Sequence, residues 1–263
     1  MKRSSNTLSH KPRRVLGSPV RFSITYSRKF KTMFWQEDNP ETPFQVPDDI
    51  VDVLFSVTCK RLPVDHAYAL SAALRQAAPW IAEDDSGVAV HTVHVAGSQN
   101  GWKRPDHGTD QYLILSRRSK LTIRVPRQRT AALLKDLEGK ALDVAGCPLT
   151  IGPGKIRRLS KETTLFSRYV AAVPDAAEEA FLDWAAHALS DQGIRVRKAL
   201  CGKMTLLTTP GGMLRTRSLM LSDLAPEESV RLQQQGLGPH CEMGCGIFIP
   251  HKGIDPVSKT TSG

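Results

Sequence analysis

The segment GLGPHCEMGCGIFIPHKGI, residues 236–254, combines glycines with side chains that could do chemistry. A dinucleotide-binding loop lies between a strand and a helix and needs a third glycine where Cys241 stands, so this pattern does not fit. Zinc ligands are also present, in His240, Cys241, Cys245 and His251. They are crowded together without a second ligand pair at zinc-finger distance, and a packed thiol is the more frequent explanation. We expect a glycine-rich backbone loop here.

His66 is a second candidate, in the segment KRLPVDHAYAL, where a predicted strand gives way to a predicted helix. Asp65 is a residue type that caps helices, which would place His66 in the first helical turn. The amides and the dipole at that end favour an anion and a neutral imidazole, as a general base near a phosphate requires. The residues alone somewhat favour the alternative, in which His66 packs on the same helix face as Leu70.

His91 and His94 lie in VAVHTVHVA, whose alternation predicts a strand. Residues three apart on a strand point to opposite faces of the sheet. We therefore expect one buried ring, one exposed ring, and no site that both histidines share.

The elements that must position these residues follow one order twice. From residue 51 the hydrophobic pattern predicts a βαββαβ order, and from residue 165 the same order follows. We predict an α+β fold of two tandem ferredoxin-like (βαββαβ), RRM-like domains. The predicted parts are residues 33–152, a linker at 153–163, residues 164–254, and a flexible tail at 255–263. A single larger α/β domain is the alternative, but regular strand–helix alternation is missing.

The basic charge of the 263-residue chain is concentrated at one end. The net charge is +10, but residues 1–32 hold nine Lys or Arg and no Asp or Glu, which leaves +1 for the rest. We expect this stretch to be a disordered tail. It has the composition of a nucleic-acid-binding arm or a transit peptide, but we favour an extension upstream of a natural start at Met33, where globular patterning begins.

Cellular location follows from what the sequence lacks. No apolar run is long enough to span a membrane, and no apolar segment follows the basic start as in a signal peptide. Five scattered cysteines indicate reduced thiols rather than a disulfide framework. We expect a cytoplasmic protein with no membrane partner.

Cationic side chains gather on predicted hairpins and loops. Ferredoxin-like sheets often bind single-stranded RNA through such side chains and through aromatic rings. Solvated charge explains any one pair, but their number favours RNA as a partner. The candidates are Trp102, Lys103, Arg104, Arg117, Arg118, Arg195, Arg197, Arg215 and Arg217.

The tandem units, the histidine at the first helix and the glycine loop before the last strand together resemble the RAMP superfamily of CRISPR-associated proteins. Within it, the chain is most similar to the repeat-processing endoribonuclease, the sixth Cas protein. The segments that resemble a variant branch of that family are LPVDHAYAL, NGWKRP, LSRR, TLFSRYV, RSLMLSDL and GLGPHCEMGCGIFIPHKGI. The similarity runs from about Phe34 to Ile254, and its C-terminal segment is the most specific part.

The resemblance implies a metal-independent endoribonuclease, with no cofactor, that cleaves the repeats of CRISPR precursor RNA into mature guide RNA. The ribose 2′-hydroxyl would attack the adjacent phosphate, which yields a 2′,3′-cyclic phosphate and a 5′-hydroxyl. By analogy with the family, His66 would be the base, assisted by Tyr68 or by Lys60 or Arg61.

The resemblance also implies RNA contacts for the C-terminal segment. The candidates there are Gly236, Gly238, Gly244, Gly246, His251 and Lys252. A type I effector complex is a further candidate partner. The alternatives are a non-catalytic RAMP subunit that only holds guide RNA and, less favoured, a small zinc protein.

Overall fold

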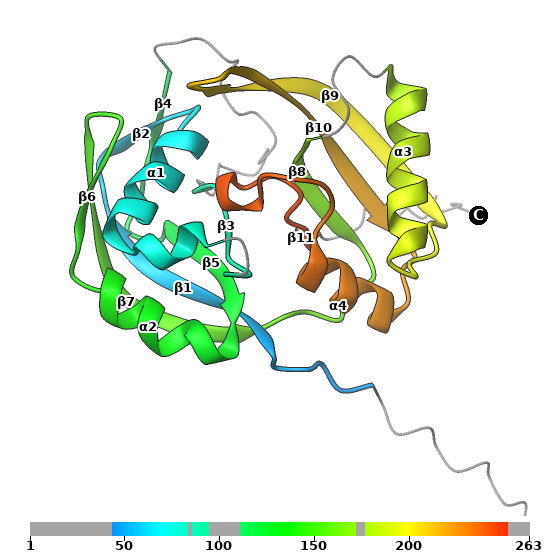
Figure 1. Ribbon diagram of the computed structural model, residues 1–263, viewed down its shortest axis with the longest axis horizontal. Coiled ribbons are helices and arrows are strands. Elements are labelled where there is room, and N and C mark those ends of the chain that lie inside the picture. Colours follow the sequence, from blue (N-terminus) through cyan, green and yellow to red (C-terminus); the bar gives the residue numbers. More distant parts are fainter. Residues whose placement is uncertain (1–43, 84–85, 95–110, 172–176, 252–263) are drawn as a thin grey trace, which may run out of the picture. The chain divides into compact units, whose positions relative to one another are not determined.

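The computed structural model describes residues 44–83, 86–94, 111–171 and 177–251 of the chain. They form two larger antiparallel sheets with helices packed against them, an α+β fold (Figure 1). None of the helices in this part of the chain is long and apolar enough to cross a membrane. The predicted tails at 1–32 and 255–263 lie outside the described residues, as do the RNA-binding candidates Trp102, Lys103, Arg104 and Lys252.

The first sheet contains five strands in the order β3-β5-β1-β7-β6, with antiparallel neighbours throughout. Its strands are β1 (Ile50–Thr58), β3 (Ala89–Val90), β5 (Lys120–Pro126), β6 (Ala141–Val144) and β7 (Cys147–Arg158). Its core is completed by α1 (Ala67–Ala77) and α2 (Thr130–Leu137), whose leucines recur at helical spacing and are buried against the sheet. The short strands β2 (Arg61–Pro63) and β4 (Tyr112–Ile114) pair separately.

The second sheet contains four strands in the order β11-β8-β10-β9. Its strands are β8 (Leu165–Ala171), β9 (Lys198–Thr209), β10 (Gly212–Ser222) and β11 (Ile249–Pro250). The helices are α3 (Glu178–Asp191) and α4 (Pro226–Gln235). On α3 the residues Phe181, Ala185 and Leu189, which recur at helical spacing, are buried together with Leu219 and Leu221 of β10. One face of this sheet therefore carries the second core.

Three predicted elements differ from the structure. The strand expected around His91 and His94 ends at Val90. The N–H of His91 still donates to Thr122 of β5, but the N–H of Val93 donates to the side chain of His66, and Thr92 lies against the loop at Gly244. The expected linker at 153–163 is in its first half the end of β7, paired with β1 as far as Arg158. Arg195 and Arg197 precede β9, so they do not lie on a strand.

Arg124 on β5 connects the first sheet to segments near the C-terminus. The side chain is 2% exposed, and its Nε donates to Asp52 Oδ1 at 2.8 Å. Its Nη1 donates to the carbonyl oxygens of Gln233, at 2.6 Å, and Phe248, at 3.2 Å. Burial alone would raise the pKa of Asp52, but the nearby charge of Arg124 holds it below its usual value. A buried charge is tolerated when it is paired and hydrogen-bonded in this way.

Replacing Arg124 should therefore destabilise the fold strongly. Arg124→Met leaves the carboxylate of Asp52 buried with Arg157 as its remaining arginine partner, and we expect the free energy of unfolding in urea to fall by about 3–5 kcal/mol. The matched control is Arg127→Ala, because Arg127 is half exposed and its pair with Asp48 is 3.6 Å long. That control should cost less than about 1 kcal/mol; equal losses in the two variants would contradict the role of Arg124.

Candidate active site

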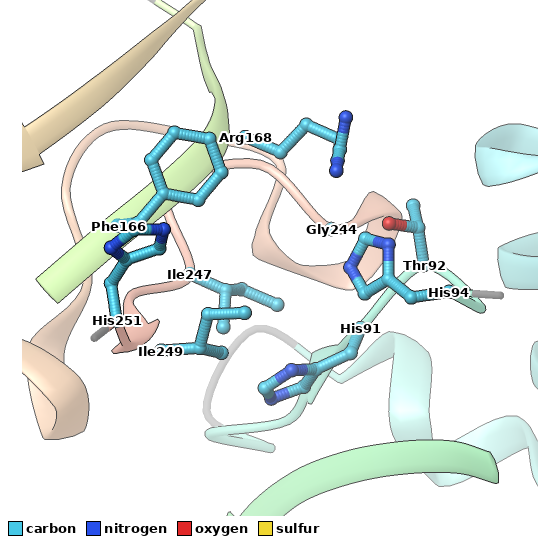
Figure 2. Close-up of a pocket in the computed structure, with 9 residues that line it drawn as sticks. All are labelled: His91, Thr92, His94, Phe166, Arg168, Gly244, Ile247, Ile249 and His251. Carbon is cyan, nitrogen blue, oxygen red and sulfur yellow. The ribbon is translucent and has the colours of Figure 1, made fainter. Parts of the chain in front are cut away.

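A cavity of about 350 Å³ brings together three histidines and an arginine from distant parts of the chain. Figure 2 shows the rings of His91 and His94 on one side and that of His251 beside Phe166 on the other. The lining residues are His91, Thr92, His94, Phe166, Arg168, Gly244, Ile247, Ile249 and His251. We call this the histidine cavity.

The cavity corrects the prediction for His91 and His94. One ring is buried and the other exposed, as expected, but both line the same cavity. The strand on which opposite faces were expected ends before His91, so strand alternation no longer separates the two side chains.

His91 is a neutral wall of the histidine cavity. Burial, and then the charge of Arg124, lowers the pKa of its imidazole to about 3. Its Nε2 lies 3.7 Å from Asp52 Oδ1, which is too long for a hydrogen bond. Among the described residues, this buried nitrogen has no hydrogen-bond partner.

Arg168 supplies the cavity's positive charge, from the middle of β8. Its Nε is buried, and no acceptor for it occurs among the described residues. A buried donor without an acceptor is costly, so such groups commonly mark a place that a ligand or water completes. An anion such as a phosphate would satisfy this donor and the charge together.

His251 is held against β8 by its backbone and its ring. Its N–H donates to the carbonyl oxygen of Thr164 at 3.0 Å, and the ring lies 5.8 Å from that of Phe166, tilted by 55°. His251 also lines two neighbouring cavities. One, of about 590 Å³, includes Arg157 and Arg158, and the other, of about 330 Å³, is mainly apolar.

His66 does not have the geometry of a general base. It is fully buried at the N-cap of α1. Its Nδ1 lies 2.8 Å from the carbonyl oxygen of Pro63, to which it must donate, and its Nε2 accepts from the N–H of Val93 at 3.0 Å. Both nitrogens are thus engaged by the backbone, and His66 is not among the residues that line the histidine cavity. The packed interpretation, which the residues alone favour, is the one that the structure supports.

The residues around His66 also differ from expectation. Asp65 does not cap α1, because its Oδ2 accepts from the N–H of Thr208 on β9 at 2.7 Å. Tyr68 is half-buried and does not line the histidine cavity. Lys60 is exposed, and the guanidinium of Arg61 lies 4.4 Å from the centre of the Tyr112 ring. None of the candidate assistants of His66 therefore joins the other histidines.

The four candidate glycines, Gly236, Gly238, Gly244 and Gly246, have positive φ angles, between 66° and 88°. Gly246 is buried, its N–H donates to the carbonyl oxygen of Tyr169, and a Cβ there would collide with the carbonyl oxygen of Leu237. That glycine is required by contacts within the protein and offers no amide to RNA. Gly236 ends α4 and donates to Leu232, and Gly238 is exposed. Only Gly244 of the four lines the histidine cavity.

The remaining cationic candidates are spread over several elements. Arg117 and Arg118 are exposed in the turn between β4 and β5. Arg197 pairs with Glu228, and although burial opposes it, this pairing lowers the pKa of the carboxyl to about 2. Arg215 and Arg217 lie two residues apart on β10, as expected. None of these arginines lines the histidine cavity.

The zinc candidates are not arranged as a metal site. Burial raises the pKa of the Cys245 thiol to about 12, which disfavours the thiolate that binds metals. Within residues 44–83, 86–94, 111–171 and 177–251, no group of three or more His, Cys, Asp or Glu is placed to hold a metal ion. His251 instead faces the histidine cavity.

Arg168 is not among the residues that the sequence predicts for a site, and His91 and His94 are predicted to share none. Their only sequence signal is residue type, because a lone Arg in SRYV on a predicted strand is ordinary. The meeting of the segment after β3, strand β8 and the C-terminal segment around one cavity is visible only in the tertiary fold.

Comparison with known proteins gives one consistent family. The family described as "Cas6 Crispr" matches residues 51–253. The CRISPR-associated endonuclease Cas6 of Myxococcus xanthus (strain DK1622) is 32% identical over 201 residues, which cover 76% of this chain and 81% of that protein.

Solved structures share the fold at low identity. One, a characterised Cas6-related gene product from Pyrococcus furiosus, has a TM-score of 0.53 and 14% identity, and covers 76% of this chain and 97% of that chain. Another, described as a RAMP protein binding different RNA substrates, has a TM-score of 0.53 and 13% identity, and the match covers 77% of this chain and 100% of that chain. At these identities the likeness extends to the fold alone.

The buried neutral ring of His91 predicts that acid weakens the fold. Between pH 6.5 and about 3 the unfolded chain binds a proton at His91 that the folded chain does not, so stability falls as the pH falls through this window. At pH 5 the loss is on the order of 2 kcal/mol. Urea unfolding at pH 7 and pH 5 should show this loss in the wild type, and His91→Asn should lack that part of it. The same pH dependence in both proteins would contradict the assignment.

Proposed function

This chain belongs to the Cas6 family, and we propose on that premise that it is an endoribonuclease that cleaves the repeats of CRISPR precursor RNA into guide RNAs. One observation carries the proposal beyond the family. The histidine cavity combines proton-transferring rings with the buried Nε–H of Arg168, which finds no acceptor in the described part of the chain. That combination suits a phosphodiester whose cleavage needs proton transfer and charge stabilisation.

The proposal includes two tandem ferredoxin-like domains. The strand orders support it: the first and third strands of each βαββαβ order, β1 with β5 and β8 with β10, are neighbours inside their sheets. In each sheet the second strand (β3 or β9) lies beside the third, and the fourth strand (β7 or β11) lies beside the first. Strand β6 is an additional strand at the edge of the first sheet. Ferredoxin-like sheets are a common platform for single-stranded RNA.

In the proposed reaction the ribose 2′-hydroxyl oxygen attacks the adjacent phosphorus, and the bond from phosphorus to the 5′ oxygen breaks. His94 and His251 lie on different sides of the histidine cavity (Figure 2). One takes the 2′ proton, and the other, protonated beforehand, gives a proton to the leaving 5′ oxygen. Each such group contributes about 10²–10⁴-fold to the rate. The products are a 2′,3′-cyclic phosphate and a 5′-hydroxyl, and no step requires a metal.

Arg168 stabilises the charge that grows on the phosphorane oxygens. Its position on a central strand of the second sheet holds the guanidinium in place before the substrate arrives, so little reorganisation is needed during the reaction. His66 acts as a positioning residue, because its bond to Val93 holds the segment that carries His91 and His94.

Cleavage of a repeat RNA by the purified full chain in EDTA tests the proposal. His94→Ala, His251→Ala and Arg168→Ala should each lower the single-turnover rate by about 10²-fold or more. A repeat that lacks only the 2′-hydroxyl at the cut should resist cleavage. His187→Ala, which removes an exposed histidine of α3, is the matched control and should cleave at the wild-type rate.

A repeat with sulfur in place of the leaving 5′ oxygen separates the two histidines, because a thiolate leaves without a proton. The variant whose rate this substrate restores has lost the acid. If His66→Ala abolishes cleavage with fold and RNA affinity retained, while His94→Ala and His251→Ala cleave at the wild-type rate, the base is His66 and the present assignment is wrong. A wild-type protein that binds the repeat without cutting it would instead identify a non-catalytic RAMP subunit.

A further inference from the structure

An apolar row crosses all four strands of the second sheet. Ile249 of β11 pairs with Phe166 of β8, Phe166 pairs with Met220 of β10, and Met220 pairs with Leu200 of β9. Cross-strand partners share a face. The flanking residues Leu219 and Leu221 enter the core with α3 and α4, so the row lies on the face opposite those helices. Leu200 is 59% exposed there.

A hollow interrupts this face beside the row. The register slips on both sides of Ser218, because β8 and β9 each carry one extra residue opposite it. Such bulges locally open and twist a sheet. Gly202 of β9 faces Ser218, and a Cβ at Gly202 would collide with the hydroxyl oxygen of Ser218. The glycine therefore leaves room for the side chain of Ser218, and both residues line the hollow.

The hollow and three residues of the row, Phe166, Met220 and Leu200, line the apolar cavity of about 330 Å³. It shares Phe166 and His251 with the histidine cavity, so the two adjoin across that ring pair. One compartment carries a cation and proton-transferring rings, and the next is apolar and lined by an aromatic ring. A nucleotide has the same division, because its phosphate is charged and its base is planar with apolar faces.

We propose that the apolar cavity binds the unpaired base of a nucleotide next to the cut, while the adjoining phosphate lies in the histidine cavity. This inference rests on the proposed function, since it names the part of the RNA that the same site holds. Bases splayed from single strands commonly stack on aromatic side chains of four-stranded sheets. Phe166 provides the ring, and Met220 and Leu200 extend the apolar surface beneath the base.

The test measures the affinity of the full chain for a repeat RNA made uncleavable by deoxyribose at the cut. Leu200→Ala combined with Met220→Ala removes the apolar wall, and we expect the Kd to rise by about 5- to 150-fold, the range of one stacked base. The matched control is Leu206→Ala with Met213→Ala, which removes the same residue types from the same two strands. Both control residues are exposed and neither lines the apolar cavity, so the control should bind like the wild type.

A second set of RNAs identifies the base. Abasic nucleotides placed singly along the repeat should weaken wild-type binding most at one position beside the cut, and that loss should disappear in the Leu200→Ala, Met220→Ala variant. Equal affinities of the wall and control variants, or an abasic loss that persists unchanged in the wall variant, would overturn the inference.

The inference and the proposed function fail in different experiments. Absence of cleavage by the wild type refutes the nuclease but not the base site, which the uncleavable RNA reports independently. Normal cleavage by the wild type, with no position-specific abasic effect, refutes the base site and leaves the nuclease standing.

Discussion

The buried charge of Arg124 is the interaction on which the rest of the structure depends. It extends from β5 to the carboxylate on β1, the last turn of α4 and the carbonyl oxygen before β11. A buried cation is tolerated only when its donors have acceptors, so the guanidinium of Arg124 is satisfied only when these four segments come together. The same charge contributes to keeping the His91 ring neutral. The guanidinium of Arg124 therefore both connects the segments of the fold and influences the charge of a ring that lines the histidine cavity.

The candidate active site is formed by segments that are distant in the sequence, and no single sequence motif contains it. The segment after β3 supplies two histidines, β8 supplies Arg168 and Phe166, and the C-terminal segment supplies His251. The glycines that mark the C-terminal segment in the sequence mainly permit this assembly. With a side chain at Gly246, for example, the backbone could not approach Leu237 so closely. The most distinctive part of the sequence therefore shapes the site more than it performs chemistry.

Local patterns predicted most elements, and tertiary contacts decided the exceptions. Apolar residues at helical spacing correctly placed α1, α2 and α3, since each buries its stripe against a sheet. The α+β class and the family similarity also followed from the sequence. The base role given to His66 stays a prediction, and the contacts of both ring nitrogens with Pro63 and Val93 are what the sequence did not indicate. Nothing in LPVDHAYAL indicates a partner 27 residues away, and a helix start looks the same whether its histidine faces solvent or backbone.

The two backbone bonds of His66 have a consequence for the histidine cavity. A ring that donates from Nδ1 and accepts at Nε2 exists as a single tautomer, with its one proton on Nδ1. A second proton, on Nε2, would set two donors against each other and release Val93 together with the histidines on either side of it. The position of one hydrogen atom, in the interior and outside the cavity, thus decides whether His66 can accept the bond that holds the segment between His91 and His94.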